Sequence, residues 1–277
     1  MLDDLFKIFH KSEIQKCLKV IDETVAYNLP PEESRIFKDF HRYITDPQPE
    51  FITEWRIHPE TEHLYHQLVN GILGHTQNAY ACTHYHLSRL TNLESEVLEK
   101  LGTIEYEEEF GNSSMGVGNS LILDFEYQAF ILSYRRCLEY FSKAICTYFS
   151  TKSVSFYHLS GTLKEKEPVL VSERLIKVHN KYINDFSFVL SKGKKSTRDK
   201  ISHDEFISAG CINLNKQGFQ LAGGEENLSP FNNQSLSKAL LEKFILLRFY
   251  IQEMLCEFEE SNKTIKSAES STTPLSS

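Results

Sequence analysis

Apolar residues recur at intervals of three and four along four stretches of the chain, at residues 60–100, 121–149, 168–191 and 234–260. This spacing brings apolar side chains to one face of a helix, so each stretch predicts an amphipathic helix with a buried stripe. The main elements of the chain are therefore predicted to be all-α. The clearest stripe consists of Leu123, Tyr127, Phe130, Tyr134, Leu138, Phe141 and Ile145.

The remaining segments have weaker patterns. Shorter helices are predicted over 1–25 and 32–44, because closely spaced prolines end each apolar pattern. Residues 102–120 and 151–166 are predicted to be a loop and a linker, the first because it is rich in acidic residues, glycine and serine. Residues 263–277 have little apolar content and predict a disordered tail.

Alternation of apolar and polar residues is confined to one short segment, CINLNKQGFQL. Gly218 divides it into two halves, which predicts a small β-hairpin.

Composition limits the function classes. The net charge of −8 argues against binding nucleic acid over a broad surface. No stretch approaches the roughly 20 apolar residues that span a bilayer, and the chain does not begin with the basic and apolar segments of a secretory signal. The six cysteines form no CxxC pair. These features predict a cytoplasmic protein with reduced thiols and no membrane partner.

One segment departs from the acidic balance. Five positive residues and one negative residue, Asp199, lie between Lys192 and Lys200. Such a run is commonly a solvated loop. This one contains Arg198, which is followed by His203 after four intervening residues. An arginine fork can bind a phosphate while a histidine transfers protons near neutral pH, so the pair suits chemistry on a phosphodiester.

The spacing alone is permissive, because arginine precedes histidine by a similar interval at three other places. In each of those pairs an apolar residue follows the arginine. A pair with four intervening residues inside one helix would also have its ends about 140° apart. Arg198 instead follows a helix break and is followed by a polar residue, and Ser196 or Thr197 could cap a new helix there. The three other pairs are Arg35 with His41, Arg56 with His63, and Arg174 with His179.

The segment RDKISH at 198–203, between strong predicted helices, resembles the signature of the HEPN superfamily. These are helical-bundle proteins that include many RNA-cleaving toxins and defence nucleases. The resemblance extends over about 120–260. It implies a HEPN-like bundle over 111–262, followed by the tail 263–277. Residues 1–110 would form an N-terminal helical region, packed on the bundle or part of it.

The resemblance also implies an activity, which is metal-independent endoribonucleolytic cleavage by a toxin or defence effector. The ribose 2′-hydroxyl would attack the phosphate and leave a 2′,3′-cyclic phosphate and a 5′-hydroxyl end. In this interpretation His203 performs acid–base work, Arg198 stabilises the phosphate, and Asp199 orients a neighbour or the histidine.

Partners follow from the same resemblance. A homodimer would bring two motifs into one cleft, and an antitoxin or other regulatory protein could restrain it. Lys194, Lys195 and Lys200 would hold the RNA backbone through salt-sensitive contacts, and Glu126 on the preceding helix is a candidate for supporting the site. No cofactor and no metal are expected.

Two other interpretations were compared with this one. Histidines and a cysteine between 58 and 86 have spacings that resemble metal ligands, but on one helix His75 and Cys82 point away from the face of His66 and His84, so a tetrahedral site would need a sharp bend. Sequence signatures of phosphate loops, serine hydrolases and zinc proteases are absent. The open alternative is a non-catalytic HEPN-like module for dimerisation or for binding RNA or protein, which the acidic net charge suits.

Overall fold

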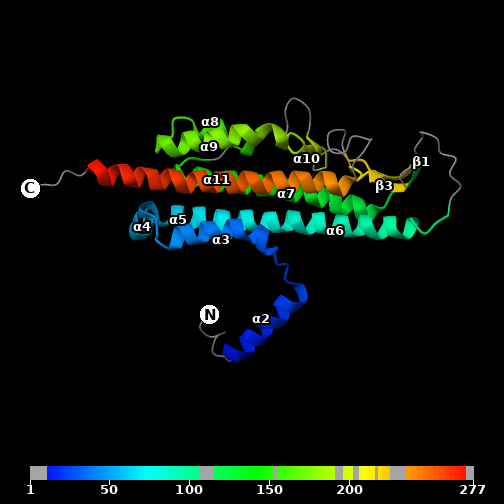
Figure 1. Cartoon of the computed structure of the whole chain (residues 1–277). Coiled ribbons are helices and arrows are strands. Elements are labelled where there is room, and N and C mark those ends of the chain that lie inside the picture. The colour runs from blue at the N-terminus through cyan, green and yellow to red at the C-terminus, as the bar shows by residue number, and fades with distance from the viewer. Residues whose placement is uncertain are drawn as a thin grey trace, which may run out of the picture.

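The computed structural model describes residues 11–105, 115–152, 155–190, 196–201, 206–215, 218–224 and 235–272. Three long helices form its frame: α6 (Gln77–Leu101), α7 (Leu121–Tyr148) and α11 (Leu236–Thr272). They run side by side, and α9 (Val169–Tyr182) packs on α11 (Figure 1). The predicted predominance of helices is confirmed.

The hydrophobic stripe of α7 lies at the centre of the bundle. Tyr127, Phe130, Tyr134 and Phe141 are all fully buried, as the spacing predicted. The buried hydroxyl of Tyr134 donates a hydrogen bond of 2.8 Å to the carbonyl oxygen of Lys243, so burial of the ring leaves no unpaired polar group there.

The helical stretch before α7 is almost continuous, in three parts. It begins as α5 (Glu62–Val69), loosens into a π-helical segment, η1 (Asn70–Thr76), and continues as α6. The glycines of this stretch fall in η1, and Gly71 packs so closely on α7 that an added Cβ would lie 2.7 Å from the Cβ of Ala144. A glycine at this position therefore allows the two helices to approach closely without displacement of either.

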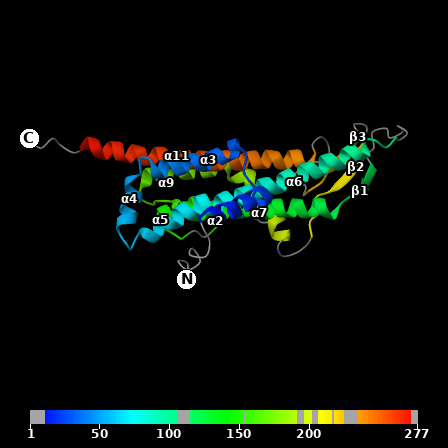
Figure 2. The ribbon, with the colours of Figure 1, turned by 90° about the horizontal axis from the view of Figure 1, so that it is seen from below.

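Residues 31–57 of the N-terminal region belong to the same core, whereas none of the described side chains of residues 11–25 is buried. The region contains α2 (Lys11–Val25), α3 (Pro31–Thr45) and α4 (Glu50–Ile57). α3 packs against the frame (Figure 2), and one buried apolar cluster extends from α3 to α11.

A buried carboxylate joins α3 to the two helices beside it. Glu33 accepts a hydrogen bond from the hydroxyl of Tyr80 on α6 and pairs at 2.9 Å with Arg248 on α11. Burial and the hydrogen bond to Glu33 raise the pKa of Tyr80, so this hydroxyl stays a donor.

A small antiparallel sheet covers one end of the bundle. Its strands are β1 (Met115–Gly118), β2 (Cys211–Asn215) and β3 (Gly218–Ala222), in the order β1-β2-β3. The predicted hairpin is confirmed as β2 and β3, with Cys211 opposite Ala222. β1 was not predicted, because its sequence is glycine-rich and its side chains are exposed, so it has no alternating pattern.

Three other boundaries differ from the prediction. The linker 151–166 contains η2 (Phe156–His158) and α8 (Leu159–Leu163), and the next helix ends at Tyr182 with a single 3₁₀ segment, η3 (Ile183–Phe186), beyond it.

The last helix does not end near 260 but continues to Thr272, so the prediction of a disordered tail is wrong for 263–272. The first turn beyond 260 is held against the core, since Lys263 lies over the ring of Tyr43 and Ile265 packs on the apolar cluster. Among the helices in the described ranges, none has the length and apolar content needed to cross a membrane.

Candidate functional site

The motif segment begins as a capped turn. Ser196 is the N-cap of α10 (Thr197–Asp199), and its hydroxyl oxygen accepts a hydrogen bond of 3.2 Å from the backbone amide of Asp199. The same hydroxyl donates to the Asp199 carboxylate at 2.9 Å. The predicted cap is confirmed, and these reciprocal bonds fix the direction of the segment.

Asp199 also orients its neighbour in the sequence. The Nη1 atom of Arg198 lies 2.7 Å from Asp199 Oδ1, and the arginine side chain is 37% exposed. One end of the guanidinium is thus held by a carboxylate while part of the group remains accessible. Lys200 continues the turn, with its amide bonded to the carbonyl oxygen of Ser196 at 3.0 Å.

A second guanidinium comes from α7, against which α10 packs. Arg135 pairs with Glu139, one turn further along α7, and its side chain is 17% exposed. Its buried Nη1 has no hydrogen-bond partner among the described residues. Burial lowers the pKa of Arg135, Glu139 acts in the opposite direction, and Arg198 and Asp199 are both close enough to contribute. Two arginines from different elements therefore share one electrostatic environment.

The same side of α7 anchors the chain beyond the motif. Asp124 is only 3% exposed, and its carboxylate accepts hydrogen bonds from the amide of Ala209 at 2.6 Å and the hydroxyl of Ser208 at 3.0 Å. One turn further along α7, the Gln128 amide donates to the carbonyl oxygen of Ile207 at 3.1 Å. α7 therefore holds residues 207–209 as well as α10.

The expected site residues fall in different places. Arg198, Asp199 and Lys200 lie together in the turn, whereas His203, Lys194 and Lys195 lie outside the described residues.

Glu126 is directed to another helix. Two residues correspond to about 200° around a helix, so Glu126 lies opposite both Asp124 and Gln128. Its carboxylate contacts His86 at 2.7 Å and Arg89 at 3.5 Å, both on α6. The structure therefore does not bring Glu126 to Arg198.

The pair Arg174 and His179 is separated by the helix that carries it. In α9, Arg174 reaches Glu257 at 3.6 Å, whereas His179 is buried against Phe156 and Tyr250. Burial lowers the pKa of His179 to about 4. This histidine fills the core and points away from Arg174, and the angular argument from the sequence indicated that separation.

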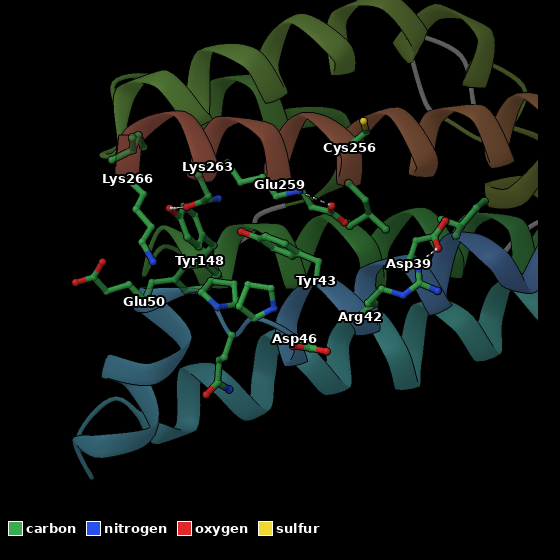
Figure 3. A pocket seen from close by; sticks show the side chains of 18 of the residues that line it. Asp39, Arg42, Tyr43, Asp46, Glu50, Tyr148, Cys256, Glu259, Lys263 and Lys266 are labelled. Atoms are coloured by element: carbon green, nitrogen blue, oxygen red, sulfur yellow. Dashed lines mark hydrogen bonds and ion pairs between the residues drawn. The ribbon is translucent and has the colours of Figure 1, made fainter. Parts of the chain in front are cut away.

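A pocket lies away from the motif, between α3, α4 and α11 (Figure 3). It has a volume of about 880 Å³ and mixed charge, with Arg42 and Lys263 near Asp46 and Glu259. No group of three or more histidine, cysteine or acidic side chains within the described ranges is placed to hold a metal ion.

Sequence reasoning missed Arg135. The available signal was a charged residue directly after Tyr134, at the edge of the apolar stripe, because charged groups are rarely buried without a partner. Spacing rules could not connect it to Arg198, which is 63 positions away in the chain.

Comparisons with family models, with curated proteins and with solved structures give no match.

Proposed function

We propose that this chain is a metal-independent endoribonuclease with a HEPN-like bundle, in which Arg198 and His203 act on an RNA phosphodiester. The observation that carries the proposal is the turn of Arg198, which is fixed by Ser196 and Asp199 and packs against α7, the helix that carries Arg135. Each guanidinium is held by a carboxylate, Arg198 by Asp199 and Arg135 by Glu139, and the exposed part of Arg198 can still donate hydrogen bonds to an anionic phosphate.

RNA provides the nucleophile itself. In the proposed step, one histidine removes the proton of the ribose 2′-hydroxyl, and the 2′-oxygen attacks phosphorus. The bond to the 5′-oxygen breaks, and a second histidine protonates that oxygen. The products are a 2′,3′-cyclic phosphate and a 5′-hydroxyl. His203 from each subunit of a homodimer supplies the two proton-transfer groups.

The arginines act on the phosphate. Charge accumulates on its non-bridging oxygens as the 2′-oxygen attacks, and preorganised cationic donors stabilise that charge without reorganising. Asp199 keeps the Arg198 fork in one orientation, and Lys200, with Lys194 and Lys195, contacts the RNA backbone. The acidic net charge confines RNA binding to this segment.

The test is cleavage of total RNA by the purified protein and by His203→Ala, with His41→Ala as the control. His41 is exposed on α3 and is preceded by an arginine at a similar spacing. We expect discrete fragments with cyclic phosphate ends from the parent protein and the control, a loss of at least about 10²-fold in His203→Ala, and no effect of EDTA.

Two outcomes would reject the proposal. Cleavage that survives in His203→Ala would exclude the acid–base assignment, and dependence on a divalent ion would exclude the mechanism. A protein that forms a dimer and binds RNA or a protein without cutting RNA would instead be the binding module that the sequence left open.

A further inference from the structure

A thiol, an imidazole and a carboxylate meet between α6 and α7, on the side of α7 opposite to Asp124 and Gln128. His86 Nδ1 lies 2.7 Å from Glu126 Oε2, and Arg89 Nε lies 3.5 Å from Glu126 Oε1. Cys82 precedes His86 by one helical turn, so the two side chains lie next to each other on one face of α6. A nucleophile next to a base, with the base held by a third group, is the arrangement of an activated nucleophile.

The surrounding charges favour a thiolate. Interaction with His86 lowers the pKa of Cys82, burial opposes it, and Ser133 and Arg136 on α7 lower it further. For His86, burial lowers the pKa, but the interactions with Cys82 and Glu126 together outweigh burial and raise it. The charged groups facing the pair from both helices are thus Glu126, Arg89 and Arg136.

Access separates this cysteine from the buried ones. Cys82 is exposed, whereas Cys137 and Cys146 are buried, and burial alone raises the pKa of Cys137. A thiolate needs both low pKa and exposure to react with a solute. Cys82 has both.

The helix limits which reaction is feasible. Acyl transfer to a thiol develops an oxyanion, which enzymes stabilise with free backbone amides. Cys82 lies in the interior of α6, where backbone amides are already bonded to carbonyl groups one turn earlier. A peroxide requires no such amides, because its leaving oxygen needs only a proton.

We propose that Cys82 is a site of oxidation by hydrogen peroxide, with His86 as the proton donor and Glu126 as the positioning residue that holds His86. The thiolate sulfur attacks one peroxide oxygen, an S–O bond forms and the O–O bond breaks. The leaving hydroxide takes the proton of the His86 imidazolium. The products are a cysteine sulfenic acid, neutral His86 and water.

The chain contains a matched control. Cys256 on α11 is also exposed, but burial and the neighbouring carboxylates, Glu260 first, raise its pKa. The full-length protein would be treated with a low concentration of hydrogen peroxide in the presence of dimedone, which traps sulfenic acids. Mass spectrometry would then quantify the dimedone label at each cysteine over time. We expect Cys82 to be labelled at least about tenfold faster than Cys256.

Variants test the roles assigned to His86 and Glu126. His86→Gln and Glu126→Gln should each slow labelling of Cys82 several-fold and leave Cys256 unchanged. Because either change could disturb the packing of α6 on α7, Arg136→Gln, at an exposed position, should lower the rate in the same direction in a folded protein.

Alkylation by iodoacetamide across pH gives the second measurement. The pH at which the alkylation rate reaches half its maximum should be lower for Cys82 than for Cys256. Equal peroxide rates at the two cysteines would overturn the proposal, as would rapid alkylation of Cys82 without sulfenic acid formation. An unchanged Cys82 rate in all three variants would overturn the assigned roles. None of these readouts depends on RNA cleavage.

Discussion

The two sides of α7 hold polar groups in different ways. On the side toward α10, Asp124 and Gln128 bind backbone atoms of a distant segment, and Arg135 approaches Arg198. On the side toward α6, Glu126 binds the side chains of His86 and Arg89.

The difference teaches how one helix can serve two sites. A carboxylate that binds backbone amides fixes the path of the chain, whereas one that binds an imidazole changes the chemistry of a side chain. Residues two positions apart point about 200° away from each other, so both kinds of site fit on one helix without interfering.

Substitution of two neighbouring arginines should give the largest difference in function between the two sides of α7. Arg135 belongs to the α10 side and Arg136 to the Cys82 side. If the proposed function holds, Arg135→Gln should lower RNA cleavage by about 10²-fold, because a preorganised donor to the phosphate is lost. Arg136→Gln should leave cleavage within about twofold and slow peroxide labelling of Cys82. Initial rates of both reactions measure this, and equal losses in both variants would contradict the separation.

Histidines near the two sides should respond to pH with opposite signs. His179 packs on Phe156, whose amide bonds to Glu139, the partner of Arg135. With a native pKa of about 4, His179 stays neutral while the unfolded chain takes up a proton below about 6.5. The free energy of unfolding should therefore fall by roughly 3 kcal/mol as the pH drops from about 6.5 to 4.

His86 should behave in the reverse way. The pKa of His86 is higher in the folded protein than in the unfolded chain. Protonated His86 therefore stabilises the fold at a pH below its unfolded-state pKa, and this stabilisation is lost as the pH rises through its folded-state pKa. Urea unfolding between pH 4 and 8 measures both effects. In His179→Gln the free energy of unfolding should fall less as the pH drops, and in His86→Gln the stabilisation at low pH should be smaller than in the parent protein. Identical pH profiles for the two variants would contradict the assignment.

The sequence was most informative where burial repeats regularly. The α7 stripe, the hairpin around Gly218 and the cap at Ser196 were all predictable, because each depends on residues close together in the chain. β1 was not, because it pairs with β2 about 95 positions away and carries no alternating pattern. The end of α11 was missed because single contacts, such as Lys263 on Tyr43, extend a helix whose own sequence is polar.

The site was predictable only in part for the same reason. Arg198 and Asp199 are adjacent, so their pairing could be expected from the sequence. The approach of Arg135 and the contact of Glu126 with His86 depend on which way α7 is rotated against its neighbours, and a single sequence does not fix that rotation.

Removal of the carboxylate on each side of α7 should lower the free energy of unfolding by different amounts. Asp124→Ala leaves the amide of Ala209 without its acceptor in a buried position, which should lower the free energy of unfolding by about 2 to 3 kcal/mol. Glu126→Ala removes an ion pair to side chains that are themselves partly exposed, so about 1 kcal/mol is expected. Chemical denaturation of both variants at pH 7 measures the difference, and a larger loss in Glu126→Ala would reverse the comparison.

A smaller effect than that of Asp124→Ala concerns packing on the side of α7 that faces η1 and α6. In Gly71→Ala the new methyl group would lie 2.7 Å from the Cβ of Ala144, so η1 must move away from α7. Overpacking of this kind should lower the free energy of unfolding by about 1 to 2 kcal/mol. Gly74→Ala is the matched control, because nothing lies within 4 Å of its added Cβ.

The control should be neutral or slightly stabilising, since alanine favours a helix by up to about 1 kcal/mol over glycine. If instead both variants lose the same free energy, the cost comes from the π-helical backbone of η1 and not from contact with Ala144. The close approach would then be a consequence of the backbone geometry, and this side of α7 would tolerate larger residues once η1 became a regular helix.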